Sequence, residues 1–297
     1  MNAKLLLPFG MIAVGWLQFA AEESPSRGVV PEEFVRARPG KLNRTSAAPK
    51  YVRISGSAAD RVNPKTSTLP VQQLGLTIWR LRPSNSADSG ARILVHDETG
   101  SIEFTPERVS NGESLRVGDR VRLSIESAQN GRLYVVDQER YSDGNLGPSY
   151  LIFPTTRTRN GDNVMTPGKV IEIPAQDDRP NYFTMKRSRP DQTGEVLTVV
   201  VSPQPIDNIT PGRDPLILPA DQIAKWQSQW GRRIEQLELA GGSRKAWTKA
   251  EQDAGAGGTR LLTQDEPGPQ TVYRVRSGGA SQPLLVRVDL KYRSDKR

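Results

Sequence analysis

From Leu74 onward the sequence consists of short apolar runs that alternate with a period of two and are separated by turn residues. This pattern constrains the fold most, because period-two alternation is typical of β-strands whose two faces differ. Strands are expected over residues 74–81, 121–126, 133–136, 150–153, 170–173, 182–185 and 196–201. Short strands at this spacing predict a mainly β fold, an immunoglobulin-like β-sandwich, with a barrel as the alternative.

Two of these runs make different predictions about burial. The run at 74–81 has apolar residues on both faces, so we expect a strand that is buried on both sides near Trp79. In the run from Arg120 to Glu126, Val121, Leu123 and Ile125 alternate with polar residues. That alternation predicts a strand with one face exposed to solvent.

Dipeptides that favour tight turns separate several of the runs. They are Asn111-Gly112, Asn130-Gly131, Asp143-Gly144 and Asn160-Gly161. Asn and Gly both accept the positive φ that two-residue hairpin turns require. Because Asn130-Gly131 lies between two strong runs, it predicts a β-hairpin there.

The first 21 residues have the order of a secretory signal peptide. Lys4 precedes an uncharged apolar stretch from Leu5 to Ala21, and Glu22-Glu23 follows it. A membrane-spanning helix is the alternative, but it needs about 20 apolar residues and this stretch contains Pro8 and Gly10. We therefore expect cleavage near residue 21 and a periplasmic or secreted protein, and retention of the segment as an anchor stays open. Since the chain has no cysteine, a lipid-modified cysteine after cleavage is excluded.

Residues 22–73 are expected to form a basic, largely disordered linker. They are rich in Pro, Ser, Ala, Arg and Lys and show no sustained apolar period. Between residues 34 and 73 there are eight basic residues and one acidic residue, Asp60. The domain boundary is therefore predicted at Leu74.

The formal net charge of +8 lies mainly outside the middle of the chain. Residues 74–206 hold 16 basic and 17 acidic residues, so this region is nearly neutral. A basic chain suggests nucleic acid as a partner, but a secretion signal argues against it. We expect the partner to be an envelope protein or an anionic envelope surface, such as phospholipid headgroups or acidic glycans, and no nucleic acid.

Several segments between about residues 110 and 206 together resemble a known family. They are Arg116 to Leu123, Gly131 to Val136, Tyr150 to Pro154, Asp162-Asn163, Gly168, Ile173-Pro174 and Leu197 to Pro205. In order and spacing they are similar to the bacterial domain of unknown function 4384. The sequence departs from that family's first motif at Arg132, where a tyrosine is usual. The resemblance implies a β-rich accessory module in residues 74–206, and it brings no catalytic residues.

Residues 207–297 are expected to add a helix and a hairpin that pack on the sandwich. Ile223, Trp226, Trp230, Ile234 and Leu237 recur at helical spacing, so we expect a helix over 221–239 that docks this stripe on the β core. The runs 271–276 and 284–292 predict a terminal β-hairpin. Its exposed face would be a basic ribbon of partner-binding residues, namely Arg274, Arg276, Arg287 and Lys291.

Composition excludes much of enzyme chemistry. With one histidine and no cysteine, two-histidine zinc motifs, thiol nucleophiles and disulfides are impossible. No motif for a catalytic serine, a phosphate-binding loop or a dinucleotide occurs, so we expect no catalytic residue, cofactor or metal site.

The sequence therefore predicts an exported, non-enzymatic protein that binds or scaffolds in the cell envelope or outside the cell. One alternative is a carbohydrate- or peptidoglycan-binding module with Trp226, Trp230 or Trp247 exposed for stacking. A less favoured alternative is a hydrolase that uses carboxylates. Asp177-Asp178 does not suit it, because adjacent residues on a strand point to opposite faces.

Overall fold

The structure is a computed structural model that describes residues 30–40, 49–55, 70–97, 100–276, 279 and 281–294. The predicted signal peptide and parts of the predicted linker lie outside the described residues. None of the helices among these residues is long and apolar enough to cross a membrane.

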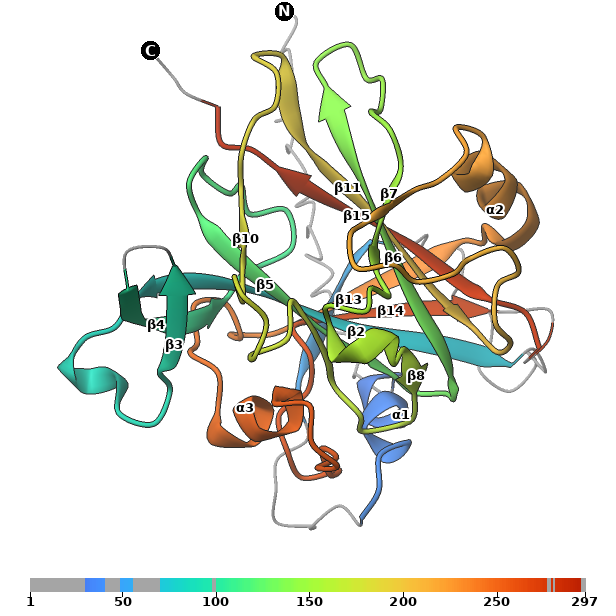
Figure 1. Cartoon of the computed structure of the whole chain (residues 1–297). Helices are drawn as coiled ribbons and strands as arrows, with labels where there is room; N and C mark the ends of the chain where they lie inside the picture. The colour runs from blue at the N-terminus through green and yellow to red at the C-terminus, as the bar shows by residue number, and fades with distance from the viewer. Residues whose placement is uncertain are drawn as a thin grey trace, which may run out of the picture.

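Two antiparallel sheets pack face to face, which confirms the predicted mainly β class and the sandwich (Figure 1). The immunoglobulin-like character stays a prediction. The first sheet contains β1 (Tyr51–Ser55), β2 (Val71–Pro83), β3 (Ile93–Asp97), β4 (Gly100–Arg108), β5 (Arg120–Ser127), β9 (Ile171–Ile173), β10 (Phe183–Thr184), β13 (Ile234–Leu239) and β14 (Thr271–Arg276). The second sheet contains β6 (Gly131–Tyr141), β7 (Tyr150–Phe153), β8 (Val164–Met165), β11 (Gln192–Ser202), β12 (Leu216–Ile217) and β15 (Leu284–Lys291). The helices are α1 (Val30–Arg36), α2 (Gln222–Trp230) and α3 (Lys249–Gly255).

Strand β2 organises the first sheet. It is 13 residues long and pairs with β5 along one edge. Its other edge is shared, with β14 beside residues 71–76 and β4 beside residues 79–83. Strand β2 is buried on both faces near Trp79, as predicted, because Leu74 and Leu76 enter the inter-sheet core and Trp79 packs in an outer cluster.

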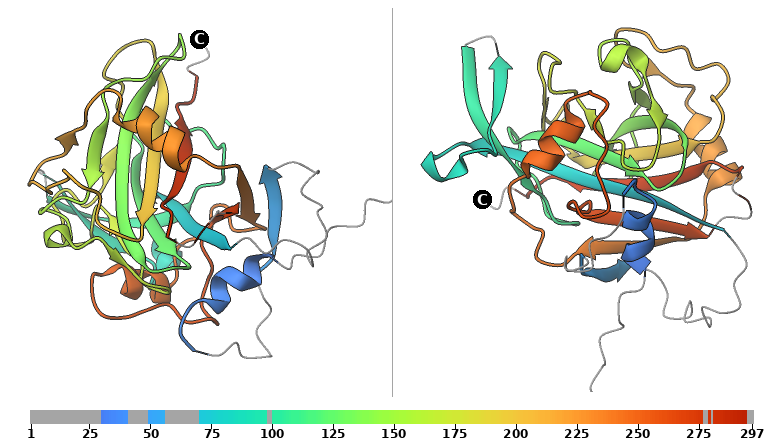
Figure 2. Two further views of the ribbon diagram at one scale, coloured as in Figure 1. Left: turned by 90° about the vertical axis from the view of Figure 1, so that its right-hand side faces the viewer. Right: turned by 90° about the horizontal axis from the view of Figure 1, so that it is seen from below.

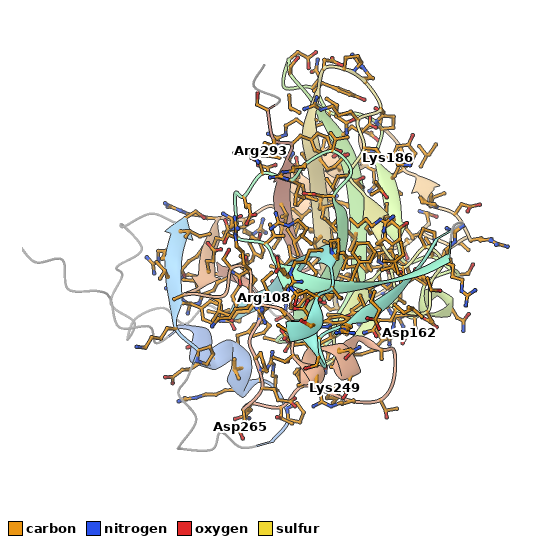
Figure 3. All side chains as sticks on the ribbon, turned by 90° about the vertical axis from the view of Figure 1, so that its left-hand side faces the viewer. Arg108, Asp162, Lys186, Lys249, Asp265 and Arg293 are labelled. Atoms are coloured by element: carbon orange, nitrogen blue, oxygen red, sulfur yellow. The ribbon has the colours of Figure 1, made fainter. Side chains whose placement is uncertain are left out.

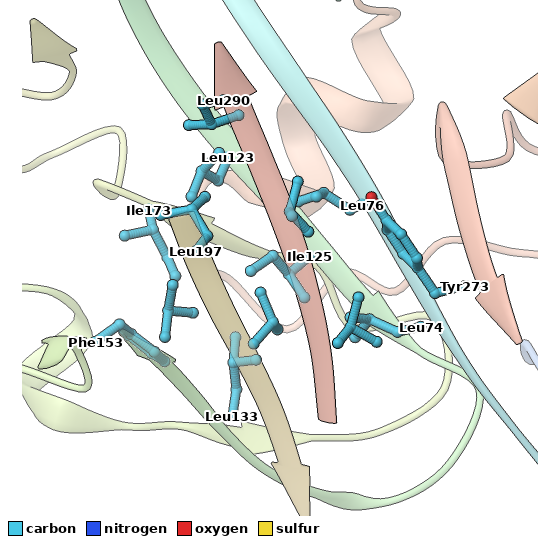
Figure 4. Close-up of a cluster of buried hydrophobic side chains, with 14 of the residues drawn as sticks. Leu74, Leu76, Leu123, Ile125, Leu133, Phe153, Ile173, Leu197, Tyr273 and Leu290 are labelled. Carbon is cyan, nitrogen blue, oxygen red and sulfur yellow. The ribbon is translucent and has the colours of Figure 1, made fainter. Parts of the chain in front are cut away.

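The main core lies between the two sheets (Figure 4). Alternate residues of β2 and β5 meet alternate residues of β6, β11 and β15, as expected when two strand faces interlock. Its buried members include Leu74, Leu76, Leu123, Ile125, Leu133, Phe153, Ile173, Leu197 and Tyr273.

The helices cover the outer faces of the sheets. Helix α2 lies across the second sheet, where Ile223 and Trp226 pack with Tyr134, Leu151 and other apolar residues (Figure 2, left). Helices α1 and α3 lie on the first sheet, as the view from below shows (Figure 2, right).

Two predicted hairpins are wrong, although their strands are right. Asn130-Gly131 joins β5 to β6, which belong to different sheets, and residues 277–283 likewise join β14 to β15. Because each strand has one apolar face, a turn can either fold back within one sheet or cross to the facing sheet, and the local sequence does not distinguish the two. Gly131 serves close packing, since a Cβ there would lie 2.7 Å from Val201 Cγ1. Asp143-Gly144 does connect a paired hairpin, β6 to β7.

The linker prediction is corrected for the described residues between 30 and 55. Phe34 and Val35 of α1 are each 1% exposed, and β1 pairs with β13. Gly75 of β2 permits this docking, because a Cβ there would lie 2.7 Å from the Phe34 ring. The basic composition misled because Arg38, one of the charges that suggested a solvated linker, is itself buried in an ion pair.

The predicted helix 221–239 is correct only in its first half. Helix α2 ends at Trp230, and Ile234 and Leu237 belong to β13, which pairs with β14 in the first sheet. Gly231 is the first residue after the helix, and a Cβ at this position would lie 2.2 Å from the carbonyl oxygen of Gln227. A residue with a side chain would therefore clash with the last turn of the helix. Docking of the stripe on the sandwich is confirmed for Ile223 and Trp226.

The polar face of β5 is not exposed as predicted, because Arg122 and Glu126 are buried and Arg120 and Ser124 are half-buried. The Arg122 side chain is fully buried and pairs with Glu172, while Glu126 pairs with Arg38. Segments that are distant in sequence cover this face and supply the opposite charges, so polar alternation coexists with burial.

Candidate functional site

Of the three tryptophans proposed for ligand stacking, two are buried and one is half-buried. Trp226 is 3% exposed and stacks on the half-buried Trp230, with ring centroids 5.4 Å apart. Trp247 is 2% exposed, packs edge-on against Trp79, and donates its indole N–H to the carbonyl of Ala91. The interpretation as exposed stacking residues is therefore wrong for Trp226 and Trp247.

The predicted basic ribbon does not form, because its residues lie on strands of different sheets. Arg274 on β14 is half-buried and pairs with Glu33 and Glu235. Arg276, also on β14, is half-buried. Arg287 and Lys291 are exposed on β15, and Asp289 between them pairs with Arg140 at 2.6 Å. These four side chains form no single cationic surface.

A cavity opens where the edges of the two sheets meet. It has a volume of about 160 Å³, and we call it the inter-sheet pocket. The second sheet contributes its β7–β12 edge, and the first sheet contributes its β9 and β10 edge. The lining residues are Ile152, Thr155, Arg157, Thr158, Ile173, Pro174, Asp178, Pro180, Tyr182, Phe183, Arg213 and Pro215.

The floor of the inter-sheet pocket is apolar and continuous with the core. Ile173 belongs to the core, and Ile152 and Phe183 pack against it. Tyr182 forms part of the wall, with the guanidinium of Arg120 4.7 Å from the centre of its ring. Prolines 174, 180 and 215 add rigid apolar surface.

Backbone and buried polar contacts fix the walls. The N–H of Thr156 donates to the carbonyl of Gly212 at 2.7 Å, which ties the loop of Arg157 to the loop of Arg213. The buried Asp178 carboxylate accepts hydrogen bonds from the Thr158 hydroxyl and from the N–H of Ala175. The pocket is therefore held in shape by its own loops.

Two arginines, Arg157 and Arg213, line the pocket and are exposed to solvent, which places them at its mouth. Arg157 is exposed and lies 3.5 Å from a carboxylate oxygen of the exposed Asp214. Within the described part of the chain, Arg213 forms no ion pair or side-chain hydrogen bond. Asp178 is engaged inside the protein and Asp214 pairs with Arg157, so Arg213 leaves one unpaired positive charge at the mouth.

A second polar cluster consists of Asp137, Glu195 and Tyr292, and the Tyr292 hydroxyl also donates to the backbone carbonyl of Lys186, which Figure 3 labels. Burial raises the pKa of Asp137 to about 7, and burial together with the nearby Asp137 raises the pKa of Glu195 to about 8. The Tyr292 hydroxyl donates to Glu195. No group of three His, Asp or Glu side chains among the described residues is placed to hold a metal ion.

Sequence reasoning did not identify the inter-sheet pocket. The residues that line it are separated by up to about 60 positions in sequence. Most of them are of types that are common in loops, so they form no recognisable motif. One signal was present, because Tyr150 to Pro154 and Ile173-Pro174, two segments that carry the family resemblance, both contribute to the pocket.

Comparison with family models, with curated proteins and with solved structures finds no match to this chain. The resemblance to the bacterial domain of unknown function 4384 therefore stays a prediction.

Proposed function

We propose that this chain is an exported, non-enzymatic β-sandwich protein that binds or scaffolds in the bacterial cell envelope, and that it binds through the inter-sheet pocket. The observation that carries the proposal is the pocket itself, an apolar cavity of about 160 Å³ with two arginines at its mouth. A concave apolar site with a few convergent polar groups is the usual form of a ligand site.

A glycan-stacking module is less well supported. Of the three tryptophans that such a module would use, Trp226 and Trp247 are buried in packing contacts with other rings. A carboxylate-based hydrolase has no favouring geometry at Asp177 and Asp178, because Asp178 is buried and hydrogen-bonded to its own loop.

Fractionation of bacteria that express the full chain tests the proposal. The wild-type chain is expected outside the cytoplasm, and part of it should remain bound to the envelope fraction after washing. Because Ile152 lines the cavity, Ile152→Trp should fill the pocket, and the envelope-bound protein should then appear in the soluble fraction. The matched control is Ile217→Trp, at a 63% exposed position on the neighbouring β12.

Retention of the wild-type chain in the cytoplasm would contradict the export proposal, and it would favour the alternative that the basic chain binds nucleic acid. Equal envelope association of the wild type and Ile152→Trp would contradict binding through the pocket. Thermal melts of both variants check that each is folded.

A further inference from the structure

Resting on the proposed function, we infer that the ligand of the inter-sheet pocket is a carboxylate that carries an apolar group about the size of one aromatic ring. The apolar group fills the cavity and the carboxylate meets Arg213 and Arg157 at the mouth.

The size of the group follows from the cavity. Its volume of about 160 Å³ is similar to that of an apolar cavity of roughly 150 Å³ that admits benzene in another protein. Ile152, Tyr182 and Phe183 present hydrocarbon to this space, as do the three prolines. A whole oligosaccharide is too large for it and too polar for such a lining.

The charge of the ligand follows from the mouth. Arg213 is exposed and has no partner within the described ranges, and Arg157 has one ion pair, at 3.5 Å, with an aspartate that is 76% exposed. Guanidinium groups present paired N–H donors that match the two oxygens of a carboxylate. A cationic ligand would be repelled by both arginines.

A carboxylate suits the site better than a phosphate. The Asp178 carboxylate lines the same pocket and Asp214 lies beside its mouth, so a doubly charged group would meet more repulsion than a singly charged one. A phosphate is also more strongly hydrated, and it would have to lose water beside the apolar wall.

Because the loops that carry the two arginines are already tied by the hydrogen bond from Thr156 to Gly212, binding needs little rearrangement of the backbone. The remaining requirement is to orient two long side chains. The side chain of Arg213 is therefore expected to contribute mainly to affinity and little to the stability of the free protein.

Isothermal titration calorimetry of the full mature chain, residues 22–297, provides the test. The probes are phenylacetate, its amide phenylacetamide, and phenyl phosphate. Phenylacetate is expected to bind in the millimolar range and about tenfold more tightly than the other two. Arg213→Gln should weaken phenylacetate binding about tenfold and leave the weak binding of the amide unchanged.

Two variants serve as controls. Arg287→Gln removes an exposed arginine on β15, far from the pocket in sequence and on another strand, and should leave all affinities unchanged. Ile152→Trp should abolish binding of every probe, since it fills the cavity. Peptides that end in phenylalanine, with a free or an amidated C-terminus, then distinguish a peptide terminus from a free organic acid as the source of the carboxylate.

Equal affinities for phenylacetate and phenylacetamide, or an Arg213→Gln variant that binds like the wild type, would overturn the inference. Tighter binding of phenyl phosphate would also overturn it. In each of these cases a loss of binding in Ile152→Trp would still support the pocket. If no probe binds, the carboxylate inference fails, while the fractionation experiment decides the proposed function separately.

Discussion

Replacing Arg38 by methionine is expected to destabilise the folded domain by about 3–5 kcal/mol. The Arg38 side chain is fully buried and donates two hydrogen bonds to Glu126, at 2.7 and 2.8 Å. It also donates to the carbonyl oxygens of Thr263, Glu266 and Pro267 at 3.0–3.1 Å. Methionine fills similar space but leaves a buried carboxylate and three carbonyls without these donors.

Urea unfolding of residues 22–297, followed by tryptophan fluorescence, measures the change. The control is Arg36→Met, two residues away, where the side chain is 61% exposed and its ion pair with Glu32 is worth about 0.5 kcal/mol or less. The double variant Arg38→Met/Glu126→Gln should recover part of the loss, because it removes the uncompensated charge.

Equal urea midpoints for Arg38→Met and Arg36→Met would refute this reasoning. Residues 30–40 would then contribute little to the stability of the domain, which would support the domain boundary predicted at Leu74. A large loss places the start of the cooperative unit at or before Arg38, well upstream of Leu74.

Two further outcomes are expected. Trp226→Ala should lower the free energy of unfolding by about 3–5 kcal/mol and Trp230→Ala by clearly less, because Trp226 is buried and Trp230 is half-buried; equal urea midpoints for the two variants would contradict the docking of α2. The folded-state pKa values of Asp137, about 7, and Glu195, about 8, lie above their unfolded values near 4. Stability should therefore fall as the pH rises from 5 to 8, and less so in Asp137→Asn; a rise in the urea midpoint over that range would contradict the burial of these carboxylates.

Period-two alternation is a local property, and it predicted the strands β2, β5, β6, β7, β9, β10, β11, β14 and β15. It did not predict β1, β3, β4, β8, β12 or β13. It did not predict which sheet each strand joins, since β5 and β6 have the same alternation whether the turn at Asn130 folds back or crosses over. Residues 234–239 were ambiguous for a related reason. Ile234 and Leu237 fit a helical stripe, and only pairing with β1 and β14 selects the strand.

Burial of polar residues was the other limit. Arg122 and Glu126 alternate with apolar residues, which is the pattern of residues that face solvent. The neighbouring sequence contains no sign that Glu172 pairs with Arg122 and that Arg38 pairs with Glu126. The inter-sheet pocket shares this property, because it exists only where loops from both sheets meet. Features built from long-range pairs are therefore visible in the structure and not in a single-sequence pattern.

The pairing of β2 with β14 and of β11 with β15 has a consequence for biosynthesis. Gly75 lies beside Val272 and Val199 beside Val286, so each sheet is completed by residues that the ribosome adds about 90 to 200 residues later. Contacts this distant in sequence form slowly and cannot form on a partial chain. A nascent chain would therefore stay loosely packed until its last strands emerge, a state that exposes it to proteases and holding chaperones and that would suit the proposed export through a narrow channel.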